Sequence, residues 1–193
     1  ELEERLLASG KKEVYDEVVN LAHLANITYI RQKETRGLGH AISCAKAFVG
    51  DEPFAVLYGD DVILGEDPAC GQLIRAYNET GKGVVGVKEV SEEAIQRYSS
   101  LKVEPLHDNW FTCTDMIEKP SKDKIMSLYS ILGRCVLPPQ IFDILAHTAP
   151  GAGGEIQLTD AIARLMSKEA VYAYQYNGKR YDCGSKEGFL QAT

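Results

Sequence analysis

Apolar and polar positions along the chain follow two recurring patterns. Short apolar runs typical of strands lie at residues 27–31, 54–58, 83–90, 101–104, 111–117, 129–137 and 171–176. Apolar residues at helical spacing predict helices over residues 11–24, 39–48, 68–80, 140–146 and 155–168. Strand runs that alternate with helical patterns are typical of α/β domains. We therefore expect an α/β fold with a mixed, mainly parallel sheet flanked by helices.

Length, composition and charge narrow the class of protein. The 193 residues are 45% hydrophobic and 25% charged, as is ordinary for a globular chain. One domain over residues 1–193 is expected. The formal net charge of −7 argues against a nucleic-acid partner, because phosphate contacts need a basic face. No apolar run approaches the roughly 20 residues of a membrane span, so no membrane partner is expected.

The cysteines and histidines carry no metal-binding signature. The five cysteines are odd in number, widely spaced and without a Cys-x-x-Cys pair, and the four histidines are scattered. A disulfide framework or a thiolate zinc site is therefore not expected. Reduced thiols in the cytoplasm are the simplest interpretation.

Acidic residues follow two of the expected strands. Asp60 and Asp61 come directly after residues 54–58, and Asp182 follows the strand-like run that begins at residue 171. Ligands of open α/β sheets bind beyond the carboxyl ends of strands. Mg²⁺ prefers one or two carboxylates together with substrate phosphates, so Asp60 and Asp182 could form a metal site. Alternatively, these acidic residues belong to ordinary polar turns without a bound ligand.

Residues between an expected strand and a helix could contact a base. Gly37 and Gly39 allow close approach of the backbone to a ligand. Gln32 has both a donor and an acceptor, so it can pair with a base edge. A loop followed by a helix start is the simpler interpretation.

Charged residues at the end of another expected strand could contact a sugar phosphate. Glu118 can accept hydrogen bonds from sugar hydroxyls, and Lys119 supplies a compact positive charge suited to phosphate. Arg134, directly after Gly133, is a further cation that faces either phosphate or solvent. A solvated strand end would also account for Glu118 and Lys119.

In their order, these segments resemble the bacterial UTP–glucose-1-phosphate uridylyltransferase family over most of the chain. The matching segments are Arg31-Gln32, Gly37-Leu38-Gly39-His40-Ala41, Gly50-Asp51-Glu52-Pro53, Gly59-Asp60-Asp61-Val62-Ile63-Leu64, Glu118-Lys119-Pro120, Pro150-Gly151-Ala152-Gly153, Glu155-Ile156-Gln157-Leu158-Thr159-Asp160-Ala161-Ile162 and Asp182-Cys183-Gly184. Each segment is common by itself, and their order and spacing together are specific.

The resemblance implies a Rossmann-like nucleotidyltransferase fold and the reaction UTP + glucose 1-phosphate → UDP-glucose + pyrophosphate, with Mg²⁺ as cofactor. The implied site residues are Asp60 and Asp182 for the metal; Asp60, Lys119 and Asp182 for catalysis; and Gln32, Gly37, Tyr98, Ser99, Glu118, Gly133 and Arg134 for substrate binding. Phosphoryl-type transfer asks the protein mainly for alignment and charge neutralisation, so no covalent nucleophile is needed. A homodimer or homotetramer is also implied.

The chain departs from the family pattern at three places. The glycine-rich Gly-x-Gly-Thr-Arg loop that wraps the triphosphate has no counterpart here. We therefore expect that an N-terminal segment is absent and that the isolated chain has little or no activity. Tyr98-Ser99 stands where relatives usually carry Tyr-Gly, which puts tight contact with glucose in doubt, and Leu128 stands near a usual Asn.

Two alternatives remain open from the sequence. A glycosyltransferase that consumes a nucleotide sugar would also use Asp60 and Asp61 on a metal-bound diphosphate. A non-catalytic homologue that binds UDP-glucose is suggested by Ser99, and Ser99→Gly in a complete protein should then raise activity.

Overall fold

The computed structural model describes residues 1–193, which form two compact units, Glu1–Arg31 and Gln32–Thr193. The first unit contains the helices α1 (Leu2–Ala8) and α2 (Lys12–Leu21), and no residue of either helix is buried. Helix α2 confirms the helix expected there.

The strand expected over residues 27–31 is wrong. This segment has no regular structure, and the strand orders of both sheets leave it out. A strand exists only where a neighbour takes up its backbone hydrogen bonds, and an apolar run alone does not supply one. The side chain of Tyr29 is 92% exposed as a result.

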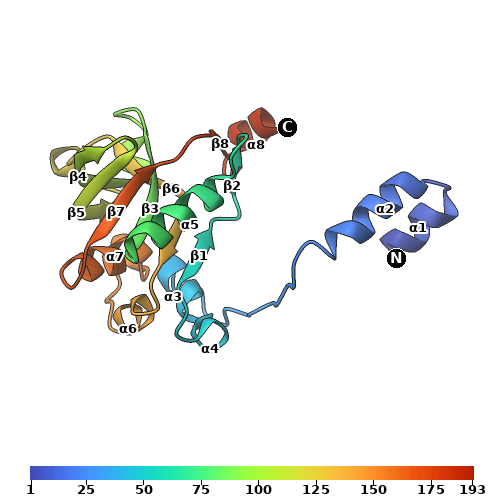
Figure 1. Ribbon diagram of the computed structural model, residues 1–193, viewed down its shortest axis with the longest axis horizontal. Coiled ribbons are helices and arrows are strands. Elements are labelled where there is room, and N and C mark those ends of the chain that lie inside the picture. The colour runs from blue at the N-terminus through green and yellow to red at the C-terminus, as the bar shows by residue number, and fades with distance from the viewer. The chain divides into compact units, whose positions relative to one another are not determined.

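The second unit is built on a six-stranded sheet, in the order β1-β6-β3-β7-β5-β4, and a separate two-stranded ribbon, β2-β8 (Figure 1). The strands are β1 (Phe54–Leu57), β2 (Asp61–Leu64), β3 (Gly83–Glu89), β4 (Ser99–His107), β5 (Trp110–Glu118), β6 (Tyr129–Leu137), β7 (Val171–Gln175) and β8 (Lys179–Asp182). The helices are α3 (Leu38–Ser43), α4 (Lys46–Val49), α5 (Ala69–Thr80), α6 (Ile141–Ala146), α7 (Leu158–Met166) and α8 (Lys186–Ala192), with 3₁₀ turns at Ile95–Arg97, Lys122–Lys124 and Ala152–Gly154.

The sheet is mixed, as predicted, and the expectation that it is mainly parallel is wrong for these strands. Only β3 and β7 pair in parallel, and the other neighbours are antiparallel. Strands β4 and β5 show the reason, because the turn at Asp108 and Asn109 is too short for the crossover that a parallel pair needs. Asp108 adopts a left-handed φ of 44° in that turn.

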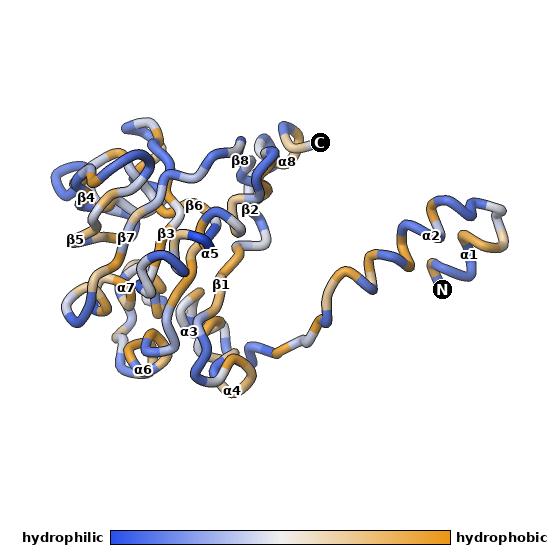
Figure 2. Tube along the Cα trace, in the orientation of Figure 1, coloured by the Kyte–Doolittle hydropathy of each residue, from blue (hydrophilic) through white to orange (hydrophobic).

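Strand side chains alternate between two apolar cores. Val84 faces α5 on one side of β3, whereas Val85 and Val87 face the core formed with α6 and α7 on the other side. This period of two is the ordinary geometry of a strand covered on both faces. The tube in Figure 2 shows the corresponding hydrophobic colour along β3 and β6. Helix α7 confirms the amphipathic helix expected there.

Two of the expected elements differ in detail. The helix expected over residues 39–48 is divided into α3 and α4, which are separated by Cys44 and Ala45. The strand expected over residues 54–58 is present as β1, but it is not buried, because it is an edge strand that pairs only with β6. The side chain of Leu57 is 53% exposed.

A bulge in β6 shapes the site end of the sheet. Val85 pairs with Cys135 and Val87 pairs with Ile131, so three residues of β6 (132–134) stand opposite the single Gly86. Bulges re-aim backbone and side chains and are common beside functional sites. This bulge contains Gly133 and Arg134.

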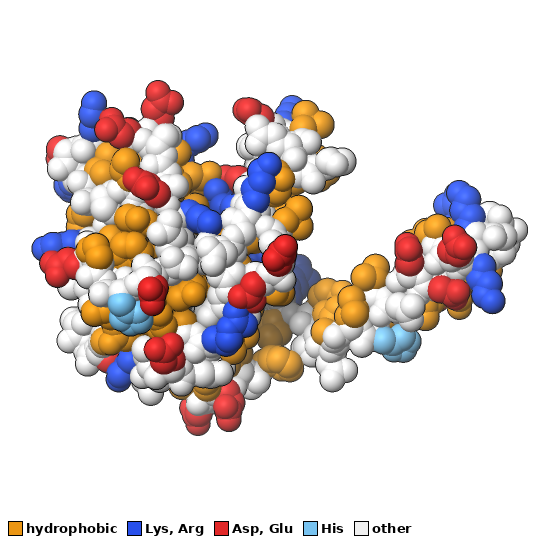
Figure 3. Space-filling model, turned by 45° about the horizontal axis from the view of Figure 1, so that its top comes forward, with side chains coloured by type: hydrophobic (Ala, Val, Ile, Leu, Met, Phe, Trp, Pro, Cys, Tyr) orange, Lys and Arg blue, Asp and Glu red, His pale blue; other side chains and the backbone are white.

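The surface and the helices complete the description. On the face shown in Figure 3, acidic and basic side chains of the second unit are interspersed. None of the helices combines the length and apolar character that crossing a membrane would require.

Candidate functional site

A cavity of about 160 Å³ opens where the ends of several strands meet the start of α7. Its polar lining consists of Tyr58, Asp60, Asp61, Tyr98, Ser99, Glu118, Gln157, Thr159, Arg180 and Asp182. Of the residues predicted for the site, the cavity brings together five: Asp60, Tyr98, Ser99, Glu118 and Asp182. Gln32, Gly37, Lys119, Gly133 and Arg134 do not line it.

The acidic residues meet because of the register of the small ribbon. Strands β2 and β8 are antiparallel, with Asp61 directly opposite Asp182. The backbone N–H of Cys183 donates to the carbonyl of Asp60 at 2.7 Å, which extends the pairing into the turns. Two segments that are distant in sequence therefore present their carboxylates at one end of the ribbon.

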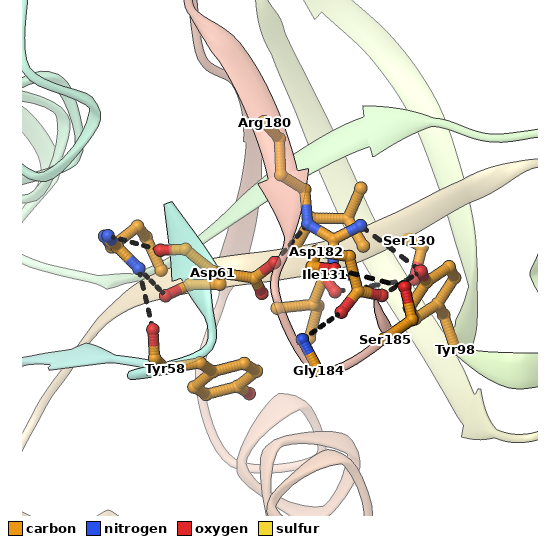
Figure 4. A network of polar contacts seen from close by, with 12 residues as sticks. Tyr58, Asp61, Tyr98, Ser130, Ile131, Arg180, Asp182, Gly184 and Ser185 are labelled. Carbon is orange, nitrogen blue, oxygen red and sulfur yellow. Dashed lines mark hydrogen bonds and ion pairs between the residues drawn. The ribbon is translucent and has the colours of Figure 1, made fainter. Parts of the chain in front are cut away.

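The Asp182 carboxylate is held in one orientation (Figure 4). Its Oδ2 accepts a hydrogen bond from the Tyr98 hydroxyl at 2.5 Å and lies 3.5 Å from Nη2 of Arg180. Its Oδ1 accepts from the backbone N–H of Gly184 at 3.1 Å. Partial burial raises the pKa of Asp182, but Tyr98 and Arg180 outweigh it and hold that pKa below its ordinary value. Asp182 is therefore an oriented carboxylate that stays ionised.

Asp61 is a structural anchor for Arg180. The Asp61 side chain is 5% exposed, and its Oδ1 accepts a hydrogen bond from Nε of Arg180, which is itself 14% exposed. Burial raises the pKa of Asp61, and the guanidinium of Arg180 opposes that rise. The same guanidinium lies over the Tyr98 ring, 4.9 Å from its centroid.

Sequence reasoning did not identify Arg180 as part of the site. A usable signal was present, because residues two apart in a strand share a face, and Arg180 and Asp182 are two apart. Detecting it required knowing that β8 begins at Lys179 and that β2 is its partner.

The Asp60 and Asp182 carboxylates lie on either side of Gly184. A Cβ added to Gly184 would lie 3.0 Å from Oδ2 of Asp60 and 3.1 Å from Oδ1 of Asp182, so both carboxylates border the room that this glycine leaves. The structure contains no group of three or more His, Cys, Asp or Glu residues placed to hold a metal. Two carboxylates without a full protein cage is the arrangement that suits Mg²⁺ bound together with phosphates.

Gly133 and Arg134 shape the turn that carries Asp60 and Asp61. Gly133 has a left-handed φ of 77°, and a Cβ there would lie only 2.6 Å from Cβ of Asp61. The Arg134 guanidinium donates to the backbone carbonyls of Tyr58, Gly133 and Asp61 at 3.3, 2.7 and 3.0 Å. Its donors are thus directed at the turn, and substrate binding by Gly133 and Arg134 stays a prediction.

The Ser99 hydroxyl lies between β4 and β6. Ser99 Oγ accepts from the backbone N–H of Ile131 and lies 3.1 Å from Oγ of Ser130, which in turn accepts from the backbone N–H of Ser99. Both serines are buried. The hydroxyl that distinguishes Ser99 from glycine therefore joins β4 to β6, and sequence reasoning missed Ser130.

Glu118 and Lys119 end β5 beside the cavity. Oε2 of Glu118 accepts a hydrogen bond from the Thr159 hydroxyl at 2.7 Å. Burial raises the pKa of Glu118, and the Thr159 hydrogen bond and the Lys119 ammonium oppose that rise. Lys119 has a left-handed φ of 46°, which is rare for a side chain of this size and typical of residues held in place at functional sites. Its exposed side chain stays outside the cavity lining.

Gln32 and Gly37 form a separate loop against the segment before α7. Nε2 of Gln32 donates to the carbonyl of Gly37 at 3.2 Å and lies 2.9 Å from Nδ1 of His40. Gly37 has a φ of 100°, and a Cβ there would lie 2.7 Å from Cβ of Glu155, so only glycine fits. The amide donor of Gln32 is used within the loop, whereas Oε1 has no hydrogen bond within the protein.

Comparison with known proteins identifies the family. The family model described as nucleotidyl transferase matches residues 4–193. The chain is 50% identical to UTP–glucose-1-phosphate uridylyltransferase 2 of Staphylococcus saprophyticus and 48% identical to UTP–glucose-1-phosphate uridylyltransferase of Staphylococcus epidermidis, in each case over all of this chain and 67% of the relative.

Solved structures agree with this assignment. A crystal structure of UDP-glucose pyrophosphorylase complexed with UDP-glucose superposes with a TM-score of 0.90 at 36% identity, over 95% of this chain and 70% of that one. A UTP-bound enzyme from Acinetobacter baumannii superposes with a TM-score of 0.84 at 34% identity, over 99% and 67% of the two chains. The fold expected from the resemblance is confirmed, and the chain belongs to the nucleotidyl transferase family, among the UTP–glucose-1-phosphate uridylyltransferases.

Proposed function

We propose that this protein transfers a uridylyl group between UTP and glucose 1-phosphate, forming UDP-glucose and pyrophosphate. The observation that carries the proposal is that Asp60 and Asp182 both border Gly184 and line the cavity that Glu118 also lines. The family relationship supplies the substrate class.

Asp60 and Asp182 would hold Mg²⁺. When bound, the ion neutralises phosphate charge and polarises the phosphoryl oxygens. The chain's own part is to keep the Asp182 carboxylate ionised and oriented, which Tyr98, Arg180 and the Gly184 N–H support.

The sugar phosphate would bind at the end of β5. Oε1 of Glu118 makes no hydrogen bond within the protein and is available to accept from a glucose hydroxyl. The exposed Lys119 ammonium would contact the sugar phosphate, with its backbone fixed by the hydrogen bond from its N–H to the carbonyl of Tyr98 at 2.8 Å. Tyr98 and Ser99 form the wall beside Glu118.

Uracil would be recognised at the loop of Gln32 and Gly37. Uracil carries one N–H donor between two carbonyl acceptors, and Oε1 of Gln32 can accept from that donor. The glycine at residue 37 keeps the backbone close to the segment before α7. A cytoplasmic location and a homodimer or homotetramer stay predictions.

Pyrophosphorolysis of UDP-glucose tests the proposal, measured on residues 1–193 and on a version of the protein extended upstream, with the variants made in whichever form shows turnover. Asp182→Asn should lower kcat/KM by about 100-fold or more, because metal-assisted charge neutralisation contributes several kcal/mol to such reactions. Asp108→Asn is the matched control, since Asp108 is 93% exposed in the β4–β5 turn and should stay within about twofold of the wild type. An Asp182→Asn protein with more than half of the wild-type kcat/KM would contradict the proposal.

A further inference from the structure

The segment from Glu155 to Ile162 carries much of the family resemblance and has no role in the function proposed above. It contains the start of α7, where Thr159 is 7% exposed and lines the cavity. The Thr159 hydroxyl donates to Oε2 of Glu118 at 2.7 Å, across 41 residues of sequence. This hydrogen bond joins α7 to the end of β5.

The hydrogen bond from Thr159 makes the two carboxylate oxygens of Glu118 different. Oε2 is occupied by Thr159, whereas Oε1 has no partner within the protein and is not sealed from solvent. A carboxylate that is free to rotate would present either oxygen to a ligand. With Oε2 held, only Oε1 is free to accept a ligand hydroxyl.

The position of Thr159 is fixed from both sides. The apolar residues Leu158 and Ile162 are buried at 1% and 0% exposure and pack α7 into the core. Before the helix, Nε2 of Gln157 donates to the carbonyl of Ala152 at 2.8 Å, and the N–H of Gly151 donates to the carbonyl of Glu155 at 2.8 Å. Core packing and these hydrogen bonds therefore fix the start of α7 and, with it, the position of the Thr159 hydroxyl.

We propose that Thr159 is a positioning residue for sugar binding, whose hydroxyl holds Oε2 of Glu118 so that Oε1 accepts from the glucosyl group. This inference rests on the proposed role of Glu118.

The charged and titratable groups around Glu118 set the direction of a pH effect. These are Lys119 on its own strand, Asp160 and Glu155 near the start of α7, and Tyr58 after β1. Burial raises the pKa of Glu118, the Thr159 hydrogen bond and Lys119 lower it, and Asp160 and Glu155 raise it. Removal of the Thr159 hydroxyl therefore raises this pKa further, and Glu118 takes up its proton at a higher pH.

Thr159→Val is the direct test, because it replaces the hydroxyl with a methyl group of similar size. In pyrophosphorolysis, we expect KM for UDP-glucose to rise about tenfold, the loss that one charge-assisted hydrogen bond predicts, with kcat changed less than about twofold. The acid limb of kcat/KM against pH should move to higher pH. Thr159→Ser, which restores the hydroxyl, should return both KM and the pH profile toward the wild type.

Thr148→Val is the matched control. Thr148, which follows α6, is also buried, at 6% exposure, but its hydroxyl donates to the carbonyl of Ile144 within α6, and the residue does not line the cavity. This variant removes a buried hydroxyl without touching Glu118, so KM and the pH profile should stay at wild-type values. Identical behaviour of Thr159→Val and Thr148→Val would overturn the inference, as would a Thr159→Ser protein as impaired as Thr159→Val.

Glu118→Gln separates this inference from the function on which it rests. A raised KM for Glu118→Gln with a wild-type KM for Thr159→Val would overturn the role of Thr159 alone. A wild-type KM for Glu118→Gln would contradict the proposed role of Glu118 and, with it, that of Thr159.

Discussion

At the scale of single residues, Gly133 leaves little room for a side chain. Its φ of 77° is left-handed, and Asp61 occupies the space that a side chain would need. Gly81, which ends α5, has a similar φ of 63° but no atom within 4 Å of an added Cβ. Both glycines therefore need a left-handed backbone, but only Gly133 also has neighbouring atoms where a side chain would be.

We expect Gly81→Ala to lower the free energy of unfolding by about 1–2 kcal/mol, the cost of a left-handed backbone with a Cβ. Gly133→Ala should cost at least about 1 kcal/mol more, because the methyl group must displace Asp61. Urea titrations of both variants measure the difference. Equal losses would show that Asp61 yields freely.

Ser99 is the second residue at which the structure changes the expected outcome. Its hydroxyl accepts from the Ile131 N–H and contacts the Ser130 hydroxyl, so it does not point at a ligand. In contrast to what the non-catalytic alternative predicts, Ser99→Gly should not raise turnover of UDP-glucose.

We expect Ser99→Gly to lower the free energy of unfolding by about 1–3 kcal/mol, because it leaves a buried N–H without an acceptor. A double-mutant cycle with Ser99→Ala and Ser130→Ala should give a combined loss smaller than the sum of the single losses, since each hydroxyl partners the other. Increased turnover of Ser99→Gly would contradict this account.

At the scale of elements, the ribbon of β2 and β8 depends on one buried ion pair. Asp61 and Arg180 are 5% and 14% exposed, whereas the ion pair between Asp67 and Arg75 is 50% and 62% exposed. Arg180→Met should therefore lower the free energy of unfolding by about 3–5 kcal/mol, because it leaves a buried carboxylate unpaired. Arg75→Met should cost no more than about 1 kcal/mol. Chemical denaturation of the two variants provides the comparison, and a similar loss for both would show that solvent reaches Asp61.

Most elements could be predicted from the sequence, because their patterns are local. The amphipathic helix α7 and the apolar strand β6 were predicted near their observed positions. The strand expected over residues 27–31 failed because its existence depends on a partner, and partners are not encoded in the segment itself. The balance of parallel and antiparallel pairs failed for the same reason.

The residues of the site also fall into those with a local sequence signal and those that depend on distant partners. Asp60, Glu118 and Asp182 follow strand ends and match family motifs, so the sequence predicted them, and the structure places them in one cavity. Arg180, Ser130 and Thr159 act through hydrogen bonds to residues between 31 and 119 positions away. Those contacts depend on strand register and helix placement, which no single-sequence pattern specifies.

At the scale of the whole molecule, the apolar core belongs to the second unit. All buried apolar residues lie at Ile42 or beyond, and α1 and α2 bury none. The fragment Gln32–Thr193 keeps every one of these buried apolar residues, so we expect it to unfold in a single cooperative transition. Urea titration followed by the fluorescence of Trp110, the sole tryptophan, measures this, and a gradual change without a transition would contradict it.

The backbone between Tyr98 and Lys119 has a consequence for redesign. Ser99 pairs with Glu118, and the next peptide along joins the Lys119 N–H to the Tyr98 carbonyl at 2.8 Å. Glu118 and Lys119, which are proposed to bind the sugar phosphate, are thus connected by a backbone hydrogen bond to Tyr98, whose hydroxyl orients the Asp182 carboxylate. Substitutions at Glu118 and Lys119 that adapt the site to another sugar should therefore also change the orientation of the Asp182 carboxylate. Substrate range and catalytic rate should be difficult to alter independently.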